Sequence, residues 1–150
     1  MYKHILVAID GSELNQRAIL HALGLARALG AQLSAVWVAE PYAPQILAGT
    51  PYPFVPVMSS SEFEEQCQSI AERLFADFRK LASEHGLGAV QTIRESALHP
   101  YEGILATVKT VGADLLVMAS HGRRGFSALV LGSETHKVLT HSTVPVLVVR

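Results

Sequence analysis

Short runs of consecutive apolar residues, each followed by a helical pattern, constrain this chain more than any other feature. The first run spans residues 5–9 and ends at Asp10. An apolar run without alternating polar residues is typical of a strand that is buried on both faces, as in a parallel sheet. We expect five strands in all. Their predicted ranges are 5–9, 33–39, 89–95, 115–119 and 144–149.

Four helices are expected between these strands. Ser12 is placed as the N-cap of the first helix, and Pro100 as the first residue of the third. A capping box in residues 61–64 predicts the start of the second helix. The fourth is expected at residues 133–141. Glycines mark the expected ends of the first three helices, at Gly30, Gly86 and Gly112.

The resulting alternation of strand and helix predicts an α/β fold. Its expected form is a three-layer sandwich, with an open five-stranded parallel sheet, right-handed crossovers and helices on both faces. Ligands of such sheets bind at the carboxyl ends of the strands, where the strand order reverses. The loops after the first and fourth strands are therefore the expected positions of a site.

The composition favours one folded unit and argues against several classes of partner. The 150 residues are 49% hydrophobic and 17% charged, so we expect a single domain over residues 1–150. The net charge of -1 shows no excess of basic residues that would point to nucleic acid, and no apolar stretch approaches the length of a membrane span. The single cysteine, Cys67, suits a reducing compartment, and the expected location is the cytoplasm. Prolines concentrate in residues 41–56, which we interpret as a long loop.

Asp10-Gly11-Ser12 forms the loop after the first strand. A carboxylate at the end of a strand is able to accept a hydrogen bond from a ribose hydroxyl, or to contact a metal ion held by phosphates. The alternative is that Asp10 only caps the helix that follows. The residues alone leave both interpretations open.

The loop after the fourth strand carries more of the features of a phosphate site. Gly122 permits close approach of the backbone to a ligand. Gly132-Ser133 opens the next helix, whose free amides and positive dipole end attract anions. Arg123 adds positive charge, and His121 is placed either against a phosphate or against the backbone. An ordinary turn followed by an N-cap is the alternative.

Several other chemistries lack their motifs. The GxxxxGK sequence of a P-loop is missing. Gly86-Leu87-Gly88 follows a helix instead of a strand, unlike a dinucleotide fingerprint. The seven histidines are scattered, so a zinc site is not expected. Ser120, His121 and Asp10 would supply a hydrolytic triad, but no G-x-S-x-G elbow supports one.

Three segments resemble the universal stress protein family. They are residues 2–12, residues 113–122 together with Gly132-Ser133, and residues 143–149. The second resembles the ATP-binding signature of that family, G-x2-G-x9-G-[S/T], and keeps its second and third glycines as Gly122 and Gly132. Ala119 stands where the signature has its first glycine. The retained glycines place the chain, by similarity, with the family members that bind ATP.

The resemblance implies a sheet with strand order 3-2-1-4-5, and a homodimer that pairs the last strand, residues 144–149, with its counterpart. It implies an ATP-binding stress-response sensor or regulator, with Mg²⁺ or Mn²⁺ accompanying the phosphates. Nothing resembles a dedicated catalytic base, so slow ATP hydrolysis is expected at most. Asp10 and Val38 are expected near the adenosine, and Ala119 near the ribose. The implied nucleotide-binding residues are Ile9, Asp10, Val38, Ala119, His121, Gly122, Arg123, Gly132, Ser133 and Glu134.

Two other functions stay open. A nucleotide-free dimeric interaction module of the same fold is favoured by Ala119. An enzyme of the related adenine-nucleotide α-hydrolase class would carry a glycine- and serine-rich pyrophosphate loop after the first strand, which residues 10–13 do not resemble.

Overall fold

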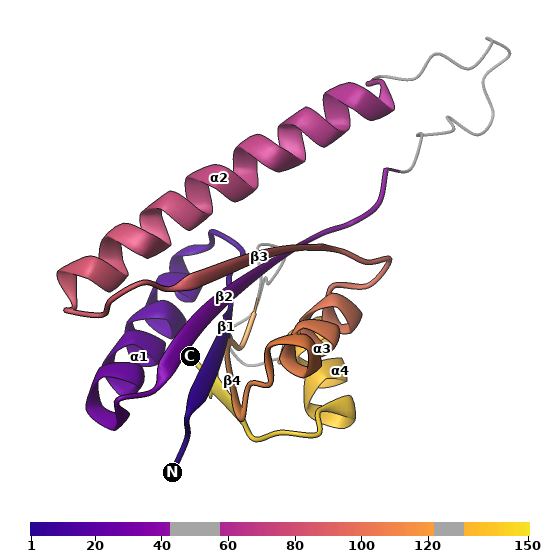
Figure 1. The fold of residues 1–150 in the computed structure, drawn as a ribbon. Coiled ribbons are helices and arrows are strands. Elements are labelled where there is room, and N and C mark those ends of the chain that lie inside the picture. Colours follow the sequence, from indigo (N-terminus) through magenta and orange to yellow (C-terminus); the bar gives the residue numbers. More distant parts are fainter. Residues whose placement is uncertain (43–57, 122–130) are drawn as a thin grey trace, which may run out of the picture.

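The computed structural model describes residues 1–42, 58–121 and 131–150. Strands and helices alternate along these residues, as the sequence predicts (Figure 1). The strands are β1 (His4–Ala8), β2 (Gln32–Ala39), β3 (Gln91–Ser96), β4 (Leu115–Ala119) and β5 (Val146–Val149). The helices are α1 (Glu13–Leu29), α2 (Ser60–Glu84), α3 (Pro100–Val111) and α4 (Ser133–His141). None of the helices in these ranges is both long and apolar enough to cross a bilayer. From residue 43 on, the predicted proline-rich loop lies outside the described residues.

All five strands form one parallel sheet in the order β3-β2-β1-β4-β5, which confirms the predicted fold class. β1 lies at the centre, where Leu6 is opposite Ser34 on β2 and opposite Leu116 on β4. The chain moves outward from β1 through β2 to β3, and then returns to β4 on the other side of β1. The strand order therefore reverses between β1 and β4. In sheets of this type, ligands bind in the crevice between the carboxyl ends of the two strands at such a reversal, here β1 and β4.

Helices cover both faces of the sheet, so the fold has the three layers predicted (Figure 1). α1 and α2 pack on one face, against residues such as Ile5 and Val7. α3 and α4 pack on the other face, against residues such as Leu6 and Val36. The side chains of Ile5, Leu6 and Val7 are fully buried, as unbroken apolar character predicts for a strand between two helix layers.

The helix boundaries follow the predicted signals, with one difference. Ser12 is the N-cap of α1, as predicted. α2 begins earlier than the sequence predicts, because the capping box is formed by Ser59 and Glu62 and not by residues 61–64. Glu64, which completes the later box in the sequence, instead forms an ion pair with Arg94 of β3. Gly30, Pro100 and Gly112 are also boundaries in the structure, as predicted. Gly86, near which the end of α2 is predicted, directly follows the C-cap His85 and has a φ of 74°.

Two strands begin later than the sequence predicts, β3 at Gln91 and β5 at Val146. In front of β5, Pro145 has no N–H group to contribute to a ladder. Its carbonyl oxygen nevertheless accepts a hydrogen bond from the Leu116 N–H, with a donor–acceptor distance of 3.0 Å. The contact with β4 therefore starts through a carbonyl group just before the regular strand.

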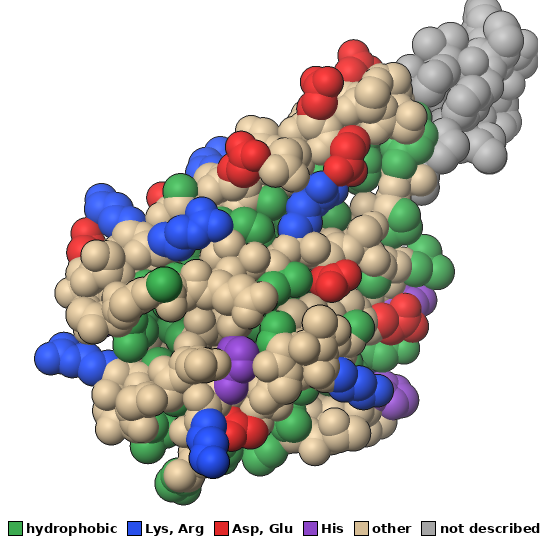
Figure 2. Space-filling view, in the orientation of Figure 1, with side chains coloured by type: hydrophobic (Ala, Val, Ile, Leu, Met, Phe, Trp, Pro, Cys, Tyr) green, Lys and Arg blue, Asp and Glu red, His purple; other side chains and the backbone are tan. Residues whose placement is uncertain are grey.

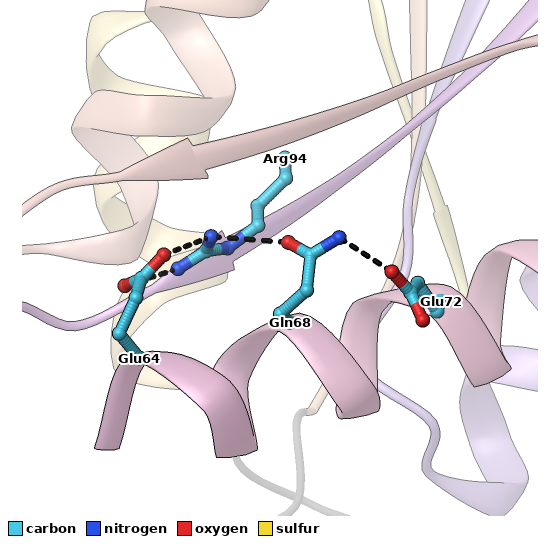
Figure 3. A network of polar contacts seen from close by, with 4 residues as sticks. All are labelled: Glu64, Gln68, Glu72 and Arg94. Carbon is cyan, nitrogen blue, oxygen red and sulfur yellow. Dashed lines mark hydrogen bonds and ion pairs between the residues drawn. The ribbon is translucent and has the colours of Figure 1, made fainter. Parts of the chain in front are cut away.

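A polar network joins α2 to β3 at the edge of the sheet (Figure 3). The Arg94 guanidinium donates to both carboxylate oxygens of Glu64 and to Oε1 of Gln68. Gln68 donates in turn to Glu72, at 2.7 Å. The hydrogen bonds from Arg94 lower the pKa of Glu64, which is exposed. Figure 2 shows acidic side chains gathered over the N-terminal half of α2, where Arg94 supplies the opposite charge.

Candidate functional site

The loop after β1 is built as a closed ring of hydrogen bonds. The Asp10 N–H donates to Asn15 Oδ1 at 3.1 Å, and the Asn15 N–H donates to Ser12 Oγ at 3.2 Å. The Ser12 N–H completes the ring by donating to Asp10 Oδ1 at 2.8 Å. The helix N-cap is thus Ser12, while Asp10 supports the turn in front of it. Oδ2 of Asp10 accepts no hydrogen bond from the residues that the structure describes.

Gly11 is required in this loop by its conformation and by its neighbour. Its φ of 77° lies in the left-handed region, where other side chains are strained. A Cβ atom at Gly11 would also lie 2.9 Å from Cδ2 of Leu74, so α2 packs directly on the loop. Ile9 precedes Asp10, is buried, and donates its N–H to the Val36 carbonyl oxygen of β2 at 2.8 Å. The loop is therefore held from α2 and from β2 as well as from α1.

Two residues predicted near the nucleoside have side chains packed into the fold. Val38 is half-buried on the α3 side of the sheet, and its methyl carbons would lie 2.8 and 3.0 Å from a Cβ at Gly103. Ala119 is 6% exposed and belongs to the core beneath α1 and α2. The methyl group of Ala119, at the position of the first signature glycine, therefore packs into the core. A ribose contact at this position would be made by the backbone of Ala119.

The first turn of α4 is fixed to the end of β4. The Gly132 N–H donates to the Ser120 carbonyl oxygen at 2.9 Å. The buried hydroxyl of Thr135 donates to the carbonyl oxygens of Ala119 and Ser120, each at 3.2 Å. A Cβ at Gly132 would lie 3.1 Å from the same Ser120 oxygen. The approach of two backbone segments thus accounts for glycine at this position before any ligand is considered.

These contacts determine which backbone N–H groups of α4 are available to bind an anion. The Gly132 N–H is already engaged by Ser120. The N–H groups of Ser133, Glu134 and Thr135 follow in the first helical turn, where amides have no acceptor within the helix. Within the described ranges no side-chain hydrogen bond caps this turn, and Ser133 is exposed. The turn therefore presents backbone donors and one hydroxyl group to an anion.

The Glu134 carboxylate joins α4 to α3. It accepts a hydrogen bond from the Tyr101 N–H at 2.9 Å and forms an ion pair with Lys137 at 2.8 Å. Burial raises the pKa of Glu134, but the hydrogen bonds from Lys137 and Tyr101 outweigh burial, so that the pKa is lowered overall. The Tyr101 ring stacks with His99 and His141, at centroid distances of 6.0 and 5.6 Å. A phosphate contact at position 134 would therefore come from the backbone N–H.

Ser120 and His121 follow β4 as a hydrogen-bonded pair. Oγ of Ser120 lies 2.9 Å from Nδ1 of His121. Ser120 is only 1% exposed, which keeps its hydroxyl away from a substrate and argues against a nucleophile. Nε2 of His121 is buried and has no hydrogen-bond partner among the described residues. Gly122 and Arg123, both predicted as ligands, lie outside the described residues.

Other features of the described chain do not compete with this crevice. Residues 1–42, 58–121 and 131–150 hold no group of three or more His, Cys, Asp or Glu side chains placed to bind a metal ion. A hollow between α3 and α4, lined by Tyr101, Leu105 and His141 among others, includes none of the predicted nucleotide-binding residues. The loops at the carboxyl ends of β1 and β4 are therefore the candidate site.

Two buried polar residues shape this site and are absent from the predicted set. Asn15 is 3% exposed and Thr135 is 2% exposed. Asn15 stands three residues before Ala18 on the buried stripe of α1, and Thr135 stands three residues before Val138 on that of α4. A polar residue on an otherwise apolar helical face is the sequence signal that marks both.

Comparison with known proteins identifies the family. The whole chain, residues 1–150, matches the profile of the Universal stress protein family. The chain belongs to this family. Universal stress protein YxiE of Bacillus subtilis is 33% identical over 150 residues, which cover 100% of both proteins. The universal stress protein UspA from Lactobacillus plantarum has the same fold, with a TM-score of 0.83 and 24% identity over 99% of this chain and 98% of that one.

Two further structures of this fold contain adenine nucleotides. One is a universal stress protein in complex with cAMP, with a TM-score of 0.68 and 22% identity over 99% of this chain and 97% of that one. The other is the universal stress protein from Archaeoglobus fulgidus in complex with dAMP, with a TM-score of 0.65 and 17% identity over 99% of this chain and 98% of that one. At these identities the likeness establishes a shared fold.

Replacing Glu134 with glutamine tests the contact between α3 and α4. At neutral pH, Glu134→Gln should lower the free energy of unfolding by about 1 kcal/mol, because it removes the charge that pairs with Lys137 and weakens the acceptor for the Tyr101 N–H. The folded-state pKa of Glu134 is below its ordinary value of 4.5. The stabilisation is therefore present above pH 4.5 and is lost as the pH falls through the lowered pKa.

Urea denaturation of both proteins at neutral and acidic pH measures this effect. The two free energies of unfolding should converge as the pH falls. A difference that stays constant over this range would contradict a role for the Glu134 charge.

Proposed function

We propose that this universal stress protein binds an adenine nucleotide, and ATP in particular, in the crevice between the carboxyl ends of β1 and β4. The observation that carries the proposal is the first turn of α4, for which no described residue supplies a side-chain cap and which Gly132 and Thr135 hold against the end of β4. A fixed helix N-terminus with unsatisfied N–H groups is a binding site for phosphate. Because β4 is the neighbour of β1, this turn borders the same crevice as Asp10.

The phosphates would lie against the start of α4. The N–H groups of residues 133–135 and the Ser133 hydroxyl supply the donors, and the positive end of the helix dipole adds to the attraction. Gly122 and Arg123 are assigned to the phosphates on the resemblance to the family signature. Mg²⁺ or Mn²⁺ would be held mainly by the phosphates and by water, since such ions need few protein ligands at nucleotide sites.

The nucleoside would lie toward β1. Oδ2 of Asp10 is placed to accept one hydrogen bond, from a ribose hydroxyl or from the adenine amino group. Ile9, Val38 and Ala119 have packed side chains, so they would shape the site through their backbone. The proteins of this fold that were solved with cAMP and dAMP support an adenine nucleoside as the common ligand. The spacing of nine residues between Gly122 and Gly132 favours ATP, by resemblance to the signature.

We assign the chain a sensor or regulator role and not a dedicated catalytic one. Ser120 is buried, so its hydroxyl is not set up as a nucleophile, and the resemblance to the family implies no dedicated catalytic base. Slow hydrolysis of bound ATP is expected at most. The nucleotide-free interaction module remains the second candidate, on the strength of Ala119 in place of the first signature glycine. The single-domain organisation and the cytoplasmic location stay predictions.

Calorimetric titration with ATP tests the proposal. The unmodified protein should bind ATP, and Asp10→Ala should weaken the binding. Ser133→Ala should cost roughly 0.5–1.5 kcal/mol of binding free energy, because it removes one hydroxyl donor and keeps the amides. Thr140→Ala is the matched control. Thr140 bonds to the His136 carbonyl oxygen toward the other end of α4, and its loss should leave ATP affinity unchanged.

Two results of these experiments would replace the proposed function with another one. If the unmodified protein binds none of ATP, AMP and cAMP, the nucleotide proposal is wrong and the interaction module is favoured. If AMP and pyrophosphate form during the titration, the chain is an enzyme of the α-hydrolase type. Gly132→Val is unsuitable as a test, because its side chain would press on the Ser120 carbonyl oxygen and disturb the turn even without ligand.

We further propose that β5 pairs with β5 of a second copy to form a homodimer. β5 is an edge strand of the sheet, and Val146, Leu147 and Val148 are each only partly buried. The carbonyl oxygens of Pro145 and Val149 accept hydrogen bonds from the β4 side, so the backbone groups of Val146 and Val148 face the open edge. Proteins normally cover an apolar edge of this kind.

A charge on this edge tests the homodimer. Val148→Lys should shift the protein from dimer to monomer, because pairing would strip water from the ammonium group. Val148→Thr has nearly the same shape and should remain dimeric. Light scattering after size-exclusion chromatography measures the mass, and circular dichroism checks that both variants keep their fold. A monomeric unmodified protein at micromolar concentration would contradict the proposal.

A further inference from the structure

We propose that Asn15 is a positioning residue, which holds the loop after β1 so that Asp10 presents one carboxylate oxygen to the bound nucleotide. This inference rests on the nucleotide site proposed above. Asn15 is 3% exposed, so it acts through Asp10 and not by touching a ligand itself.

The Asn15 side chain contacts both ends of the segment that leads to Asp10. Its Nδ2 group donates to the Ala8 carbonyl oxygen at 2.8 Å, where β1 ends. Its Oδ1 atom accepts a hydrogen bond from the Asp10 N–H at 3.1 Å. A single planar amide therefore bridges the last strand residue and the residue that carries the carboxylate. The bridge needs a donor and an acceptor on one short side chain, which asparagine supplies.

The bridge also sets the direction of the Asp10 carboxylate. With its backbone N–H held by Asn15, Asp10 places Oδ1 against the Ser12 N–H at 2.8 Å. Ser12 in turn accepts the Asn15 N–H, so the ring closes on the first turn of α1. One carboxylate oxygen is used inside the loop, and Oδ2 is left for a donor on the ligand.

A similar hydrogen bond, from a buried polar side chain to the end of a strand, is found on the other side of the crevice. Thr135 is the third residue of α4, as Asn15 is the third residue of α1. Thr135 bonds to the carbonyl oxygen of Ala119, where β4 ends, as Asn15 bonds to that of Ala8. The third residues of the remaining helices are exposed, namely Glu62 in α2 and Glu102 in α3. Buried polar residues at this position therefore occur in the two helices whose first turns border the crevice, which favours a role in placing its loops.

A double-mutant cycle between positions 15 and 10 tests the proposal. Asn15→Leu keeps the volume of the side chain and removes both hydrogen bonds, so it should weaken ATP binding by about tenfold. In the Asp10→Ala background the same change should have little further effect on ATP affinity, because the group that Asn15 positions is already missing. Calorimetric titration with ATP gives the affinities, and urea denaturation gives the free energies of unfolding.

Ser34→Ala is the matched control for a general loss of stability. Ser34 is 1% exposed, and its hydroxyl lies 2.7 Å from Nε2 of His4, near the start of β1 and away from the crevice. The control should lower the free energy of unfolding and leave ATP affinity unchanged. If Asn15→Leu does not fold, Asn15→Ser takes its place. Faster hydrogen exchange of the Asp10 N–H, measured by NMR in that variant, would show that the bridge is lost.

The outcomes separate this inference from the proposed function. A weakening of ATP binding that disappears in the Asp10→Ala background supports the positioning role. Equal weakening in both backgrounds, or lost stability with intact ATP affinity, would overturn the positioning role while the nucleotide site stands. Failure of the unmodified protein to bind ATP would overturn both.

Discussion

The parallel pairing of β1 with β2 on one side and with β4 on the other is the constraint on which the rest of the structure depends. Burial on both faces enforces this pairing, because Leu6 enters one core and Val7 enters the other. A slip of one residue would exchange the two faces of the strand. Since the chain leaves β1 and β4 in opposite directions, this type of sheet is expected to bind ligands in a crevice between their carboxyl ends. The topology alone therefore predicts the position of the candidate site.

Hydrogen bonds from buried side chains then give the two loops a fixed shape. A buried polar group left without a partner costs about 1–3 kcal/mol, so Asn15 and Thr135 stabilise the fold only while the strand ends lie within reach. Loops that are ordered before a ligand arrives lose less conformational entropy on binding. Under the proposed function, stability and nucleotide binding are linked at the same residues, so a variant at either position has to be judged by both measurements.

Local signals explain why so much of the fold can be predicted from the sequence. Ser12, Pro100 and Gly112 each act within one turn of helix, and the apolar runs need no knowledge of their neighbours. The start of α2 could not be predicted in this way. Two overlapping Ser-x-x-Glu boxes compete there, and Arg94 of a distant strand engages the glutamate of the later one.

The same distinction applies to the site. The sequence predicts a candidate site at the strand ends, which stays a prediction, and it predicts the start of α4 at Ser133, which the structure confirms. The engagement of the Gly132 N–H by Ser120 and of the Glu134 carboxylate by Tyr101 could not be predicted, because each depends on a partner far along the chain. Sequence spacing identifies residues that line a crevice. It does not show which of their polar groups are already satisfied within the protein.

A backbone NMR titration with ATP tests most directly whether the two loops form one nucleotide site. The amide signals of residues 10–12 and of residues 133–135 should shift together and saturate with a single dissociation constant, because one molecule would contact both loops. The amides of Ser34 and Asp114, near the amino ends of the strands, should keep their positions. Saturation with shifts elsewhere and none in either loop would show that the crevice between β1 and β4 is not where the nucleotide binds.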